Sequence, residues 1–318
     1  MAPRYGPPDA SLAPRYTGVR TFARLPHVIE PDGVDAAVVG VPFDTATSFR
    51  PGARFGPEAI RAGSLLLRPY HPPLAVDVFA SQSLVDWGDL AVTPGNAEKT
   101  AAQIHAGLAP LVAAGITPLV LGGDHSIVLG ELRAHAERHG PLGLVLIDAH
   151  ADTWDQYYGE RYFHGTPFRR ALEEGLLAPE RSTLVGMRGP LYGPADLEEP
   201  RDWGFEILAC DRLRTLAPAA YGQLVRERAG GGPLFLSFDI DAIDPAFAPA
   251  TGTPEVAGLL PHEALALLRA LAGLTFVGFD VVEVATAYDG PGQQTAVLAA
   301  AIAYELLALR AVAGSAPS

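Results

Sequence analysis

The sequence contains almost no cysteine and almost no lysine. Cys210 is the only cysteine among 318 residues, so the chain cannot form an internal disulfide, and a reducing compartment is the simpler assumption. An apolar stretch precedes Cys210 and Asp211 follows it, which predicts a buried, inert thiol and not a nucleophile. Lys99 is the only lysine. Because the arginines are scattered along the chain, we attribute this bias to composition.

Positive charge is also scarce. The chain has 23 basic and 36 acidic side chains, a formal net charge of −13. This charge argues against nucleic acid or an anionic membrane as a partner and suits a cationic substrate. Residues 1–16 are rich in proline and polar side chains and lack the apolar core of a signal peptide. No uninterrupted apolar segment approaches the ~20 residues that span a bilayer. We therefore expect a cytoplasmic protein.

Short apolar runs alternate with longer stretches of helical character, in a chain with 48% hydrophobic and 19% charged residues. Several of the apolar runs lack alternation, as strands buried on both faces of a parallel sheet should. The expected strands lie near 36–42, 83–87, 117–122, 143–148, 182–187, 205–210, 233–239 and 275–283. The expected helices cover roughly 57–68, 96–114, 126–139, 165–175, 217–229, 261–272 and 293–311.

This order of strand then helix predicts an α/β fold with parallel strands and right-handed crossovers. Either an open three-layer sheet or a closed eight-stranded barrel fits, and the pattern alone does not choose between them. In both architectures the chemistry gathers at the carboxyl ends of the strands. No linker-like change in composition occurs between 30 and 311. We expect one domain over 21–311, with an N-terminal tail at 1–20 and a C-terminal tail at 312–318.

Three of the expected strand ends carry metal-ligating side chains. The segment Asp-Ala-His-Ala-Asp at 148–152 places three of them at alternate positions directly after an apolar run, and alternate side chains of an extended backbone share one face. Asp-Ile-Asp at 239–241 shows the same alternation, and Gly-Gly-Asp-His at 122–125 also follows an apolar run. Carboxylates crowded in this way are stable only around a cation.

Each of these residues taken alone has an ordinary structural explanation. A lone aspartate at a strand end is more often a helix cap or turn residue than a ligand, and a lone histidine is usually a surface or satisfied core group. Together, the six residues would require three separate coincidences, so we favour ligation. Asp124 and Asp244 stand apart from the six, and each is expected either to cap a helix or to orient a ligand.

The ligand set indicates the metal and the reaction class. Four carboxylates and two imidazoles with no thiolate favour a hard divalent ion such as Mn²⁺, ahead of iron, cobalt or nickel. Six side chains are more than one ion normally draws from a protein, so a pair of ions ~3.5–4 Å apart that share carboxylates is the natural interpretation. Such a pair activates water at neutral pH, which implies hydrolysis.

The motifs resemble those of the ureohydrolases, the family of arginase and agmatinase. The resemblance lies closest to the agmatinase branch and extends over most of the chain, from about 15 to 310. The segments that carry it are GVPFDTATSFRPGARFGPEAIR (40–61), GGDHS (122–126), DAHAD (148–152), YFHGTPFRRALEEGLL (162–177), GMRGPLYG (186–193), SFDIDAIDPAFAPATGTPE (237–255) and GFDVVEVATAYD (278–289).

This resemblance implies a fold, a metal centre and a mechanism. The implied fold is the open arginase-like α/β/α sandwich with a mainly parallel sheet, in a homo-oligomer, a hexamer or trimer. The cofactor would be two Mn²⁺ ions per subunit, with Asp148 and Asp239 serving both. The implied metal ligands are His125, Asp148, His150, Asp152, Asp239 and Asp241. His164 and Glu283 would be catalytic and substrate-binding, His164 passing a proton to the leaving amine and Glu283 gripping the guanidinium, while Asp152 would also orient the attacking hydroxide.

The substrate tail is expected to be read by the segment 153–160, which is aromatic and acidic. An amine-ended tail suits such a rim, so agmatine, cleaved to putrescine and urea, is the expected substrate, with Trp154 as a tail contact or simply as a wall of the cleft. Departures from the family pattern at Ala250, Ala257, Thr286 and Gly290 lie beside the cleft.

These departures keep a guanidino acid such as 4-guanidinobutanoate as an alternative. Arg188 could meet its carboxylate, although a structural ion pair is the more ordinary explanation for that arginine. A hypothesis of another class is a catalytically weak, metal-binding paralogue that scaffolds an assembly or regulates amine metabolism. The retention of all six ligands together with His164 and Glu283 speaks against it.

Overall fold

The computed structural model describes residues 3–314 and is built around an eight-stranded sheet. Every pairing in this sheet is parallel, and the strand order is β4-β1-β5-β10-β9-β6-β7-β8. The strands are β1 (Ala36–Val41), β4 (Leu84–Asp89), β5 (Thr117–Gly122), β6 (Gly143–Ile147), β7 (Thr183–Val185), β8 (Glu206–Leu208), β9 (Leu234–Asp239) and β10 (Phe276–Val282).

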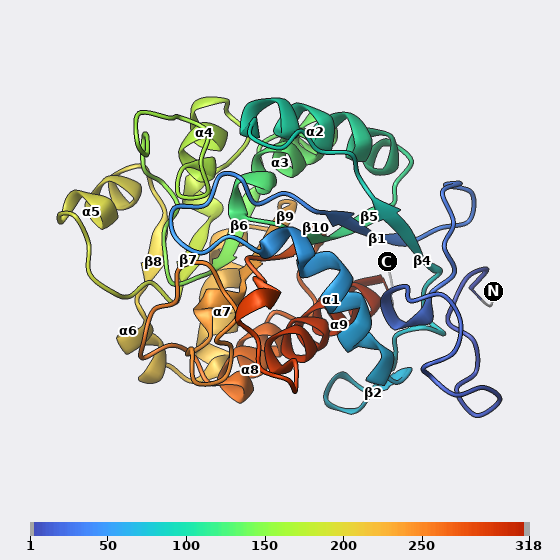
Figure 1. Cartoon of the computed structure of the whole chain (residues 1–318). Coiled ribbons are helices and arrows are strands. Elements are labelled where there is room, and N and C mark those ends of the chain that lie inside the picture. The colour runs from blue at the N-terminus through green and yellow to red at the C-terminus, as the bar shows by residue number, and fades with distance from the viewer. Residues whose placement is uncertain (1–2, 315–318) are drawn as a thin grey trace.

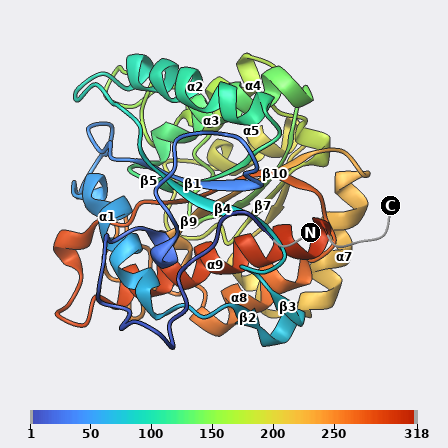
Figure 2. The same cartoon turned by 90° about the vertical axis from the view of Figure 1, so that its right-hand side faces the viewer.

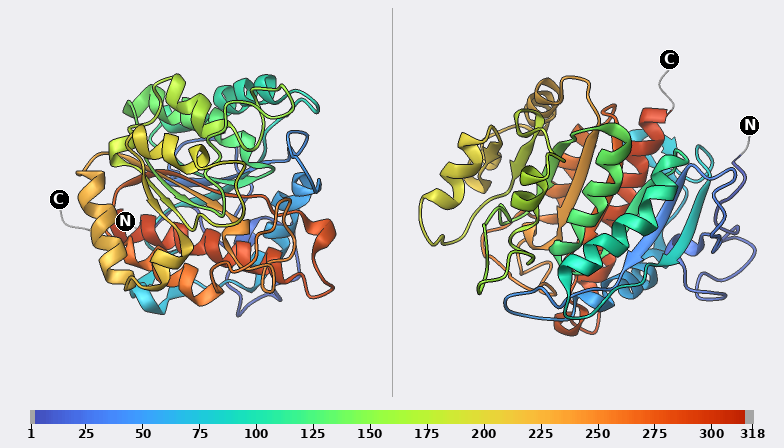
Figure 3. Two further views of the ribbon diagram at one scale, coloured as in Figure 1. Left: turned by 90° about the vertical axis from the view of Figure 1, so that its left-hand side faces the viewer. Right: turned by 90° about the horizontal axis from the view of Figure 1, so that it is seen from above.

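Helices cover both faces of the sheet. One layer contains α2, α3 and α4, and the other contains α1, α7, α8 and α9, as the two perpendicular views show (Figures 1 and 2). The left panel of Figure 3 shows the sheet nearly edge-on between the two layers. The helices are α1 (Gly56–Gly63), α2 (Ala97–Ala113), α3 (Val128–His139), α4 (Pro167–Glu173), α5 (Ala195–Asp202), α6 (Cys210–Arg214), α7 (Pro218–Ala229), α8 (Pro261–Ala270) and α9 (Gln294–Gly314).

The burial of the strands explains their composition. Every residue of β1, β6 and β9 is buried, so these strands read as continuous apolar runs with no alternation. The three-layer sandwich implied by the family resemblance is therefore confirmed. The barrel, which the sequence pattern alone left open, is excluded because β4 and β8 lie at opposite edges of an open sheet and do not pair with each other.

All eight main strands were predicted within a few residues, and four elements were missed. The short helices α5 and α6 carry little hydrophobic periodicity, and the hairpin formed by β2 (Tyr70–His71) and β3 (Val76–Asp77) has only two residues per strand. Residues 312–314 of the expected C-terminal tail are helical, because α9 continues to Gly314. Residues 315–318 and 1–2 of the expected tails lie outside the described residues.

Part of the expected N-terminal tail is attached to the sheet. The backbone N–H of Tyr5 donates to the Ser83 hydroxyl at 3.0 Å, and the N–H of Leu84 donates to the Tyr5 carbonyl at 3.1 Å. These bonds anchor the start of the described chain beside the edge strand β4.

Helix α9 is the longest helix and belongs to the core. Among residues 3–314 it is the one helix long and apolar enough to cross a membrane, although 67% of its most apolar window is buried inside the protein. It interrupts its apolar sequence with Glu305, whose carboxylate lies 2.9 Å from His71 Nε2 and also pairs with Arg269. Packing inside the fold accounts for its hydropathy.

The chain order brings the important strand ends to the middle of the sheet. Strands β1, β4 and β5 form one side and β6 to β8 the other, and the late strands β9 and β10 fill the gap between β5 and β6. In register, Val282 lies beside Asp239, and Ile147 lies beside Phe238. The carboxyl ends of β5, β6, β9 and β10 therefore meet at one edge, where open α/β sheets bind ligands.

Candidate metal centre and active site

The predicted ligands converge at this central edge. His125 lies in the short 3₁₀ turn after β5, and the segment 148–152 follows β6. Asp239 ends β9, and Asp241 lies in the 3₁₀ turn after it. Asp148 and His125 have no exposed surface, whereas the His150 side chain is 23% exposed. The structure thus brings all six together, although their roles as ligands stay predictions.

The first group of ligand atoms surrounds His125. Its Nδ1 lies 3.1 Å from Asp148 Oδ2, 3.0 Å from Asp152 Oδ2 and 3.3 Å from Asp239 Oδ2. One nitrogen and three carboxylate oxygens at these separations match the donor set that a hard divalent ion takes.

The second group surrounds His150. Its Nδ1 lies 3.0 Å from Asp241 Oδ2 and 3.5 Å from Asp148 Oδ1. Asp148 therefore contributes one oxygen to each group, as a carboxylate that bridges two ions would. Asp239, which the resemblance also assigned to both ions, faces the first group through Oδ2, while its Oδ1 accepts the N–H of Asp241 at 2.7 Å.

Several buried atoms in these groups are paired only if a cation is present. His125 Nδ1 and Asp148 Oδ2 are buried without a hydrogen-bond partner among the described residues. Burial alone would lower the pKa of His125, yet the carboxylates of Asp148, Asp152 and Asp239 raise it well above its usual value. Burial and the neighbouring charges of Asp241 and Asp148 raise the pKa of Asp239. The residues therefore fit a pair of divalent cations, which would pair the orphaned atoms and neutralise the carboxylates.

Backbone amides hold the carboxylates in position. The N–H of His150 donates to Asp148 Oδ1 at 2.6 Å, and the N–H of Ala149 donates to Asp241 Oδ1 at 3.1 Å. Because both donors belong to the segment that directly follows β6, the backbone at this strand end fixes a carboxylate from its own segment and one from the turn after β9.

His164 lies between a carboxylate and a serine. Its Nδ1 lies 3.2 Å from Glu283 Oε1, and its Nε2 lies 2.8 Å from the Ser48 hydroxyl and 3.0 Å from the Ser48 N–H. An amide only donates, so the neutral ring carries its proton on Nδ1 and donates it to Glu283. Burial would lower the pKa of His164, but the hydrogen bond and charge of Glu283 raise it above its usual value.

Glu283 is almost completely buried and is not among the residues that line the cavity described below. Its side chain is 1% exposed, and Oε1 also accepts the N–H of His125 at 2.8 Å. Its Oε2 is buried without a partner among the described residues. Oε2 is therefore the oxygen left for a guanidinium, and that role stays a prediction.

Two site residues adopt a left-handed backbone. Asp152 has φ 50° and Glu283 has φ 64°, a region that costs residues with a side chain ~1 kcal/mol or more. Both residues follow strand ends, and the sharp turn directs their carboxylates inward, toward His125 in one case and His164 in the other. Strain of this kind is concentrated at functional sites.

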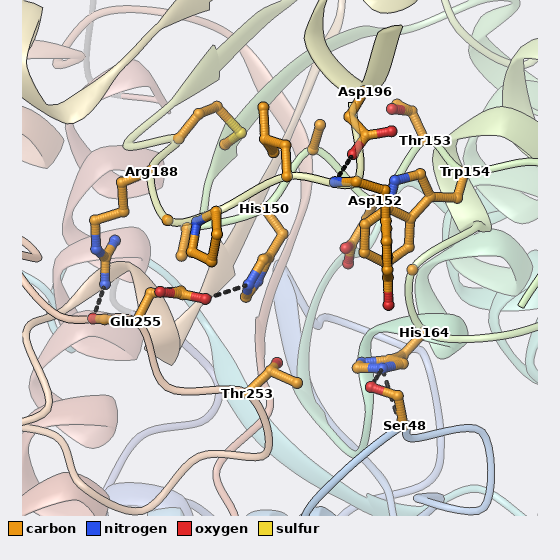
Figure 4. A pocket seen from close by; sticks show the side chains of 18 of the residues that line it. Ser48, His150, Asp152, Thr153, Trp154, His164, Arg188, Asp196, Thr253 and Glu255 are labelled. Atoms are coloured by element: carbon orange, nitrogen blue, oxygen red, sulfur yellow. Dashed lines mark hydrogen bonds and ion pairs between the residues drawn. The ribbon is translucent and has the colours of Figure 1, made fainter. Parts of the chain in front are cut away.

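A cavity of about 690 Å³ opens above the ligands (Figure 4). His150, Asp152 and His164 of the predicted site line it, together with Trp154, Asp196 and Glu255. Trp154 packs against Gly165, where an added Cβ would lie 2.7 Å from the indole. The glycine that follows His164 is thus required by the close approach of Trp154.

Aromatic side chains form the mouth of the cavity. The rings of Trp154 and Tyr157 stack with centroids 5.2 Å apart, and the hydroxyls of Tyr157 and Tyr192 lie 2.8 Å apart. The Tyr157–Tyr192 contact joins the loop after β6 to the loop before α5. Trp154 therefore lies in the cavity wall, as predicted, and its contact with a substrate tail stays a prediction.

Three residues outside the predicted ligand set have other structural roles. Asp124 accepts from the N–H groups of Ala46 and Ser126, and Asp244 accepts from that of Gly258 at 3.0 Å, so both carboxylates cap turns. Arg188 makes no ion pair among the described residues. It donates instead to backbone carbonyls, including those of Asp241 and Glu255.

The single cysteine also has no place in the predicted site. Cys210 is buried, as predicted, and burial raises the pKa of its thiol.

Sequence reasoning missed Ser48, Asp196 and Glu255 as lining residues. Ser48 lies 116 positions before His164, and nothing in its own motif indicates the contact. Asp196 belongs to the unpredicted helix α5. Glu255 ends the motif that begins at Ser237, and an acid at that place was the one available signal.

Comparisons with known proteins place almost the whole chain in one family, that of arginase. The model of the arginase family matches residues 34–309. A mitochondrial agmatinase of Gallus gallus is 46% identical, over 95% of this chain and 88% of the relative. A mitochondrial guanidino acid hydrolase of Homo sapiens is 44% identical, over 96% and 87%. The solved structure of proclavaminate amidino hydrolase from Streptomyces clavuligerus superposes with a TM-score of 0.90 at 44% identity, over 95% of this chain and all of that chain.

Proposed function

Because this chain belongs to the arginase family and is a hydrolase of guanidino compounds, we propose that its substrate is agmatine, which it cleaves to urea and putrescine. The observation that best supports hydrolysis is the pair of ligand groups that share Asp148 beside the cavity. We propose Mn²⁺ as the resident ion, since oxygen-rich ligation favours it. The bound ions would supply an activated water molecule and polarise the guanidinium.

The protein side chains orient the substrate and move a proton. His164 lines the cavity, with Nδ1 held by Glu283 and Nε2 by Ser48. The raised pKa of His164 lets the ring hold a second proton near neutral pH and pass it to the leaving amine. The unpaired Oε2 of Glu283 is proposed to accept from the guanidinium, and the inward-turned carboxylate of Asp152 to set the direction of the attacking water.

Acidic side chains at the outer part of the cavity support an amine-ended tail. Glu255, whose side chain is 24% exposed, has no ion-pair partner nearer than His150 Nε2 at 4.0 Å among the described residues. Asp196 accepts one bond, from the Tyr192 N–H at 2.8 Å. The guanidinium of Arg188 is occupied by carbonyls, so these two carboxylates remain available to an ammonium group. Trp154, which also lines the cavity, offers an aromatic face for a cation.

Arg50 favours a second candidate, a guanidino acid. It lines the cavity and lies over the rings of Phe49 and Tyr288, at 5.3 and 5.1 Å from their centroids. No carboxylate within the described residues forms an ion pair with it. A substrate with a carboxylate tail would supply that partner. The names of the related proteins also divide between agmatinase and guanidino acid hydrolase.

Urea release by the manganese-loaded protein distinguishes these substrates. We would compare agmatine, arginine, 4-guanidinobutanoate and 3-guanidinopropanoate at equal concentrations and determine kcat/KM for each. The proposal predicts the highest value for agmatine. A preference for either acid by more than about tenfold, ~1.4 kcal/mol in transition-state free energy, would replace agmatine with the guanidino acid. No urea from any substrate would favour a scaffolding role.

A further inference from the structure

A column of buried polar residues lies behind His125, on the side away from the cavity. It contains Ser237 on β9 and Asp280 on β10, with Glu131 and His135 one turn apart on α3. None of the four has more than a trace of exposed surface, and none lines the cavity. The proposed reaction uses none of them, yet burying two carboxyl groups costs several kcal/mol unless they are paired or hydrogen-bonded.

Hydrogen bonds connect this column to the metal ligand. The Ser237 hydroxyl lies 2.7 Å from Asp280 Oδ1 and 2.8 Å from His125 Nε2. Ser237 and Asp280 are paired directly across β9 and β10 in the sheet register, so their side chains share a face. The N–H of Phe238 also donates to Asp280 Oδ1, at 3.1 Å, which fixes that oxygen in place.

The count of protons sets the direction of both bonds. A serine hydroxyl has one proton, and a carboxylate oxygen only accepts. Ser237 therefore donates to Asp280, and its oxygen must accept from His125 Nε2–H. With its proton on Nε2, the neutral ring presents the Nδ1 lone pair to the three carboxylates that surround it. This is the tautomer that a metal ion at the first ligand group requires.

We infer that Asp280 is a positioning residue that acts through the Ser237 hydroxyl to hold His125 in its metal-binding tautomer. Without the carboxylate acceptor, the serine proton can turn toward Nε2 and stabilise the opposite tautomer, which carries its proton on Nδ1 and cannot bind the ion. The inference rests on the metal centre of the proposed function. It adds two residues that stand behind the ligand and contact neither ion nor substrate.

Glu131 completes the surroundings of Asp280. Burial and the charge of Asp280 raise the pKa of Glu131 well above its usual value, and Asp280 Oδ2, the oxygen not used by Ser237, has no hydrogen-bond partner among the described residues. An asparagine at 280 can therefore direct its NH₂ toward the Glu131 side while its carbonyl oxygen keeps accepting from Ser237. This makes Asp280→Asn a conservative variant that preserves the hydrogen bond and removes the charge.

Manganese affinity of the full-length protein, measured by calorimetric titration, tests the inference. Ser237→Ala and Asp280→Ala should each weaken binding at the first ligand group by ~10–100-fold. Because both act through one hydrogen-bonded chain, the double variant should be no weaker than the weaker single one. Asp280→Asn should stay within about threefold of the unaltered protein. The matched control is Thr183→Val, which removes a buried hydroxyl on β7 that has no partner among the described residues.

The results separate this inference from the metal centre itself. Failure of the unaltered protein to bind Mn²⁺ would contradict the proposed function. Normal binding by the unaltered protein together with unchanged affinity in Ser237→Ala, multiplying effects in the double variant, or an Asp280→Asn as weak as Asp280→Ala would overturn the inference alone. The thermal midpoint of each metal-free variant shows whether it folds. If Asp280→Ala does not, then Ser237→Ala and Asp280→Asn decide the matter.

Discussion

Two groups of residues at the cavity differ in burial and in how they are held in place. We call the six predicted ligands with His164 and Glu283 the cavity floor, although only His150, Asp152 and His164 of these line the cavity. We call the lining residues Trp154, Tyr157, Tyr192, Asp196 and Glu255 the cavity rim. Floor residues follow central strands and are held by backbone amides and buried partners. At the rim, the loop after β6 contacts the loop before α5 through the edge-on rings of Trp154 and Tyr192 and through the hydroxyls of Tyr157 and Tyr192, and Tyr192 is 80% exposed.

This difference indicates where the reaction and where the selectivity reside. A reaction at charged groups needs fixed atoms in a dry site, because positioning and electrostatic stabilisation both depend on geometry set before the substrate arrives. A substrate tail needs only a surface of suitable charge and shape, which exposed loops can supply and vary. We therefore expect substitutions at the floor to abolish chemistry and substitutions at the rim to change the preferred substrate.

The largest effect is expected at the carboxylate that both ligand groups share. Asp148→Asn removes the charge that bridges the two groups, so manganese content should fall below two ions per chain and urea release should drop by more than about a thousandfold. Metal analysis and a urea assay on the same preparation check this. Full activity with two ions bound would show that the floor does not depend on a bridging carboxylate.

His164 separates proton transfer from metal binding within the floor. His164→Asn should keep both ions, because the ring contacts Glu283 and Ser48 and no predicted ligand. It should lower kcat by ~10²–10⁴-fold, the usual contribution of general acid–base catalysis. Metal stoichiometry and kcat measured together test the division of roles. Loss of metal in this variant would contradict it.

The buried ring of His135, behind the floor, is expected to make the stability of the protein depend on pH. Burial lowers the pKa of His135 from 6.5 to about 3 in the folded protein, so the unfolded chain binds the extra proton first. Its contribution to stability is complete above pH 6.5 and is lost as the pH falls toward 3, up to a few kcal/mol. His135→Phe keeps a ring against Phe235 and should reduce the loss of thermal midpoint between pH 7.5 and 5.

The matched control for this pH effect is His105→Phe, at a side chain that is 37% exposed. That variant should retain the full drop in thermal midpoint between the two pH values. An equal drop in the unaltered protein and in His135→Phe would show that His135 does not govern acid stability.

The smallest effect is expected at the rim. Glu255→Gln removes one carboxylate from a partly exposed position, so KM for agmatine should rise by ~3–10-fold while kcat changes little, because exposed ion pairs contribute ~1 kcal/mol. Asp211→Asn, an exposed acid outside the cavity, is the control. If Glu255→Gln instead lowered kcat and left KM unchanged, Glu255 would belong to the floor.

The sequence predicts the floor far better than the rim. Segment 148–152 carries three ligands within five residues directly after an apolar run, so the end of β6 brings them to one place. The face expected to be shared through strand alternation is wrong, because the segment lies beyond β6 and Asp152 turns its carboxylate inward with a φ of 50°. The rim depends on how the loop after β6 meets the loop before α5, and α5 has too little periodicity to be predicted. The Tyr157–Tyr192 contact spans 35 positions, and no local pattern encodes it.

The support behind the floor is hidden from the sequence for a related reason. Ser237 and Asp280 are 43 positions apart and become neighbours only because β10 is inserted beside β9 in the finished sheet. Glu131 lies on α3, in the helix layer that covers one face of this sheet. The sequence around Glu131 does not distinguish it from an acid on the helix surface. Strand pairing between distant segments is a tertiary property, so such residues emerge only from the fold.

The most direct test of the two-metal floor is urea release from agmatine while metal-free protein is titrated with Mn²⁺. Two ligand groups that share Asp148 should make the rate rise until two ions are bound per chain and then remain constant. A plateau at one ion per chain, or a rate that does not depend on metal, would contradict the account.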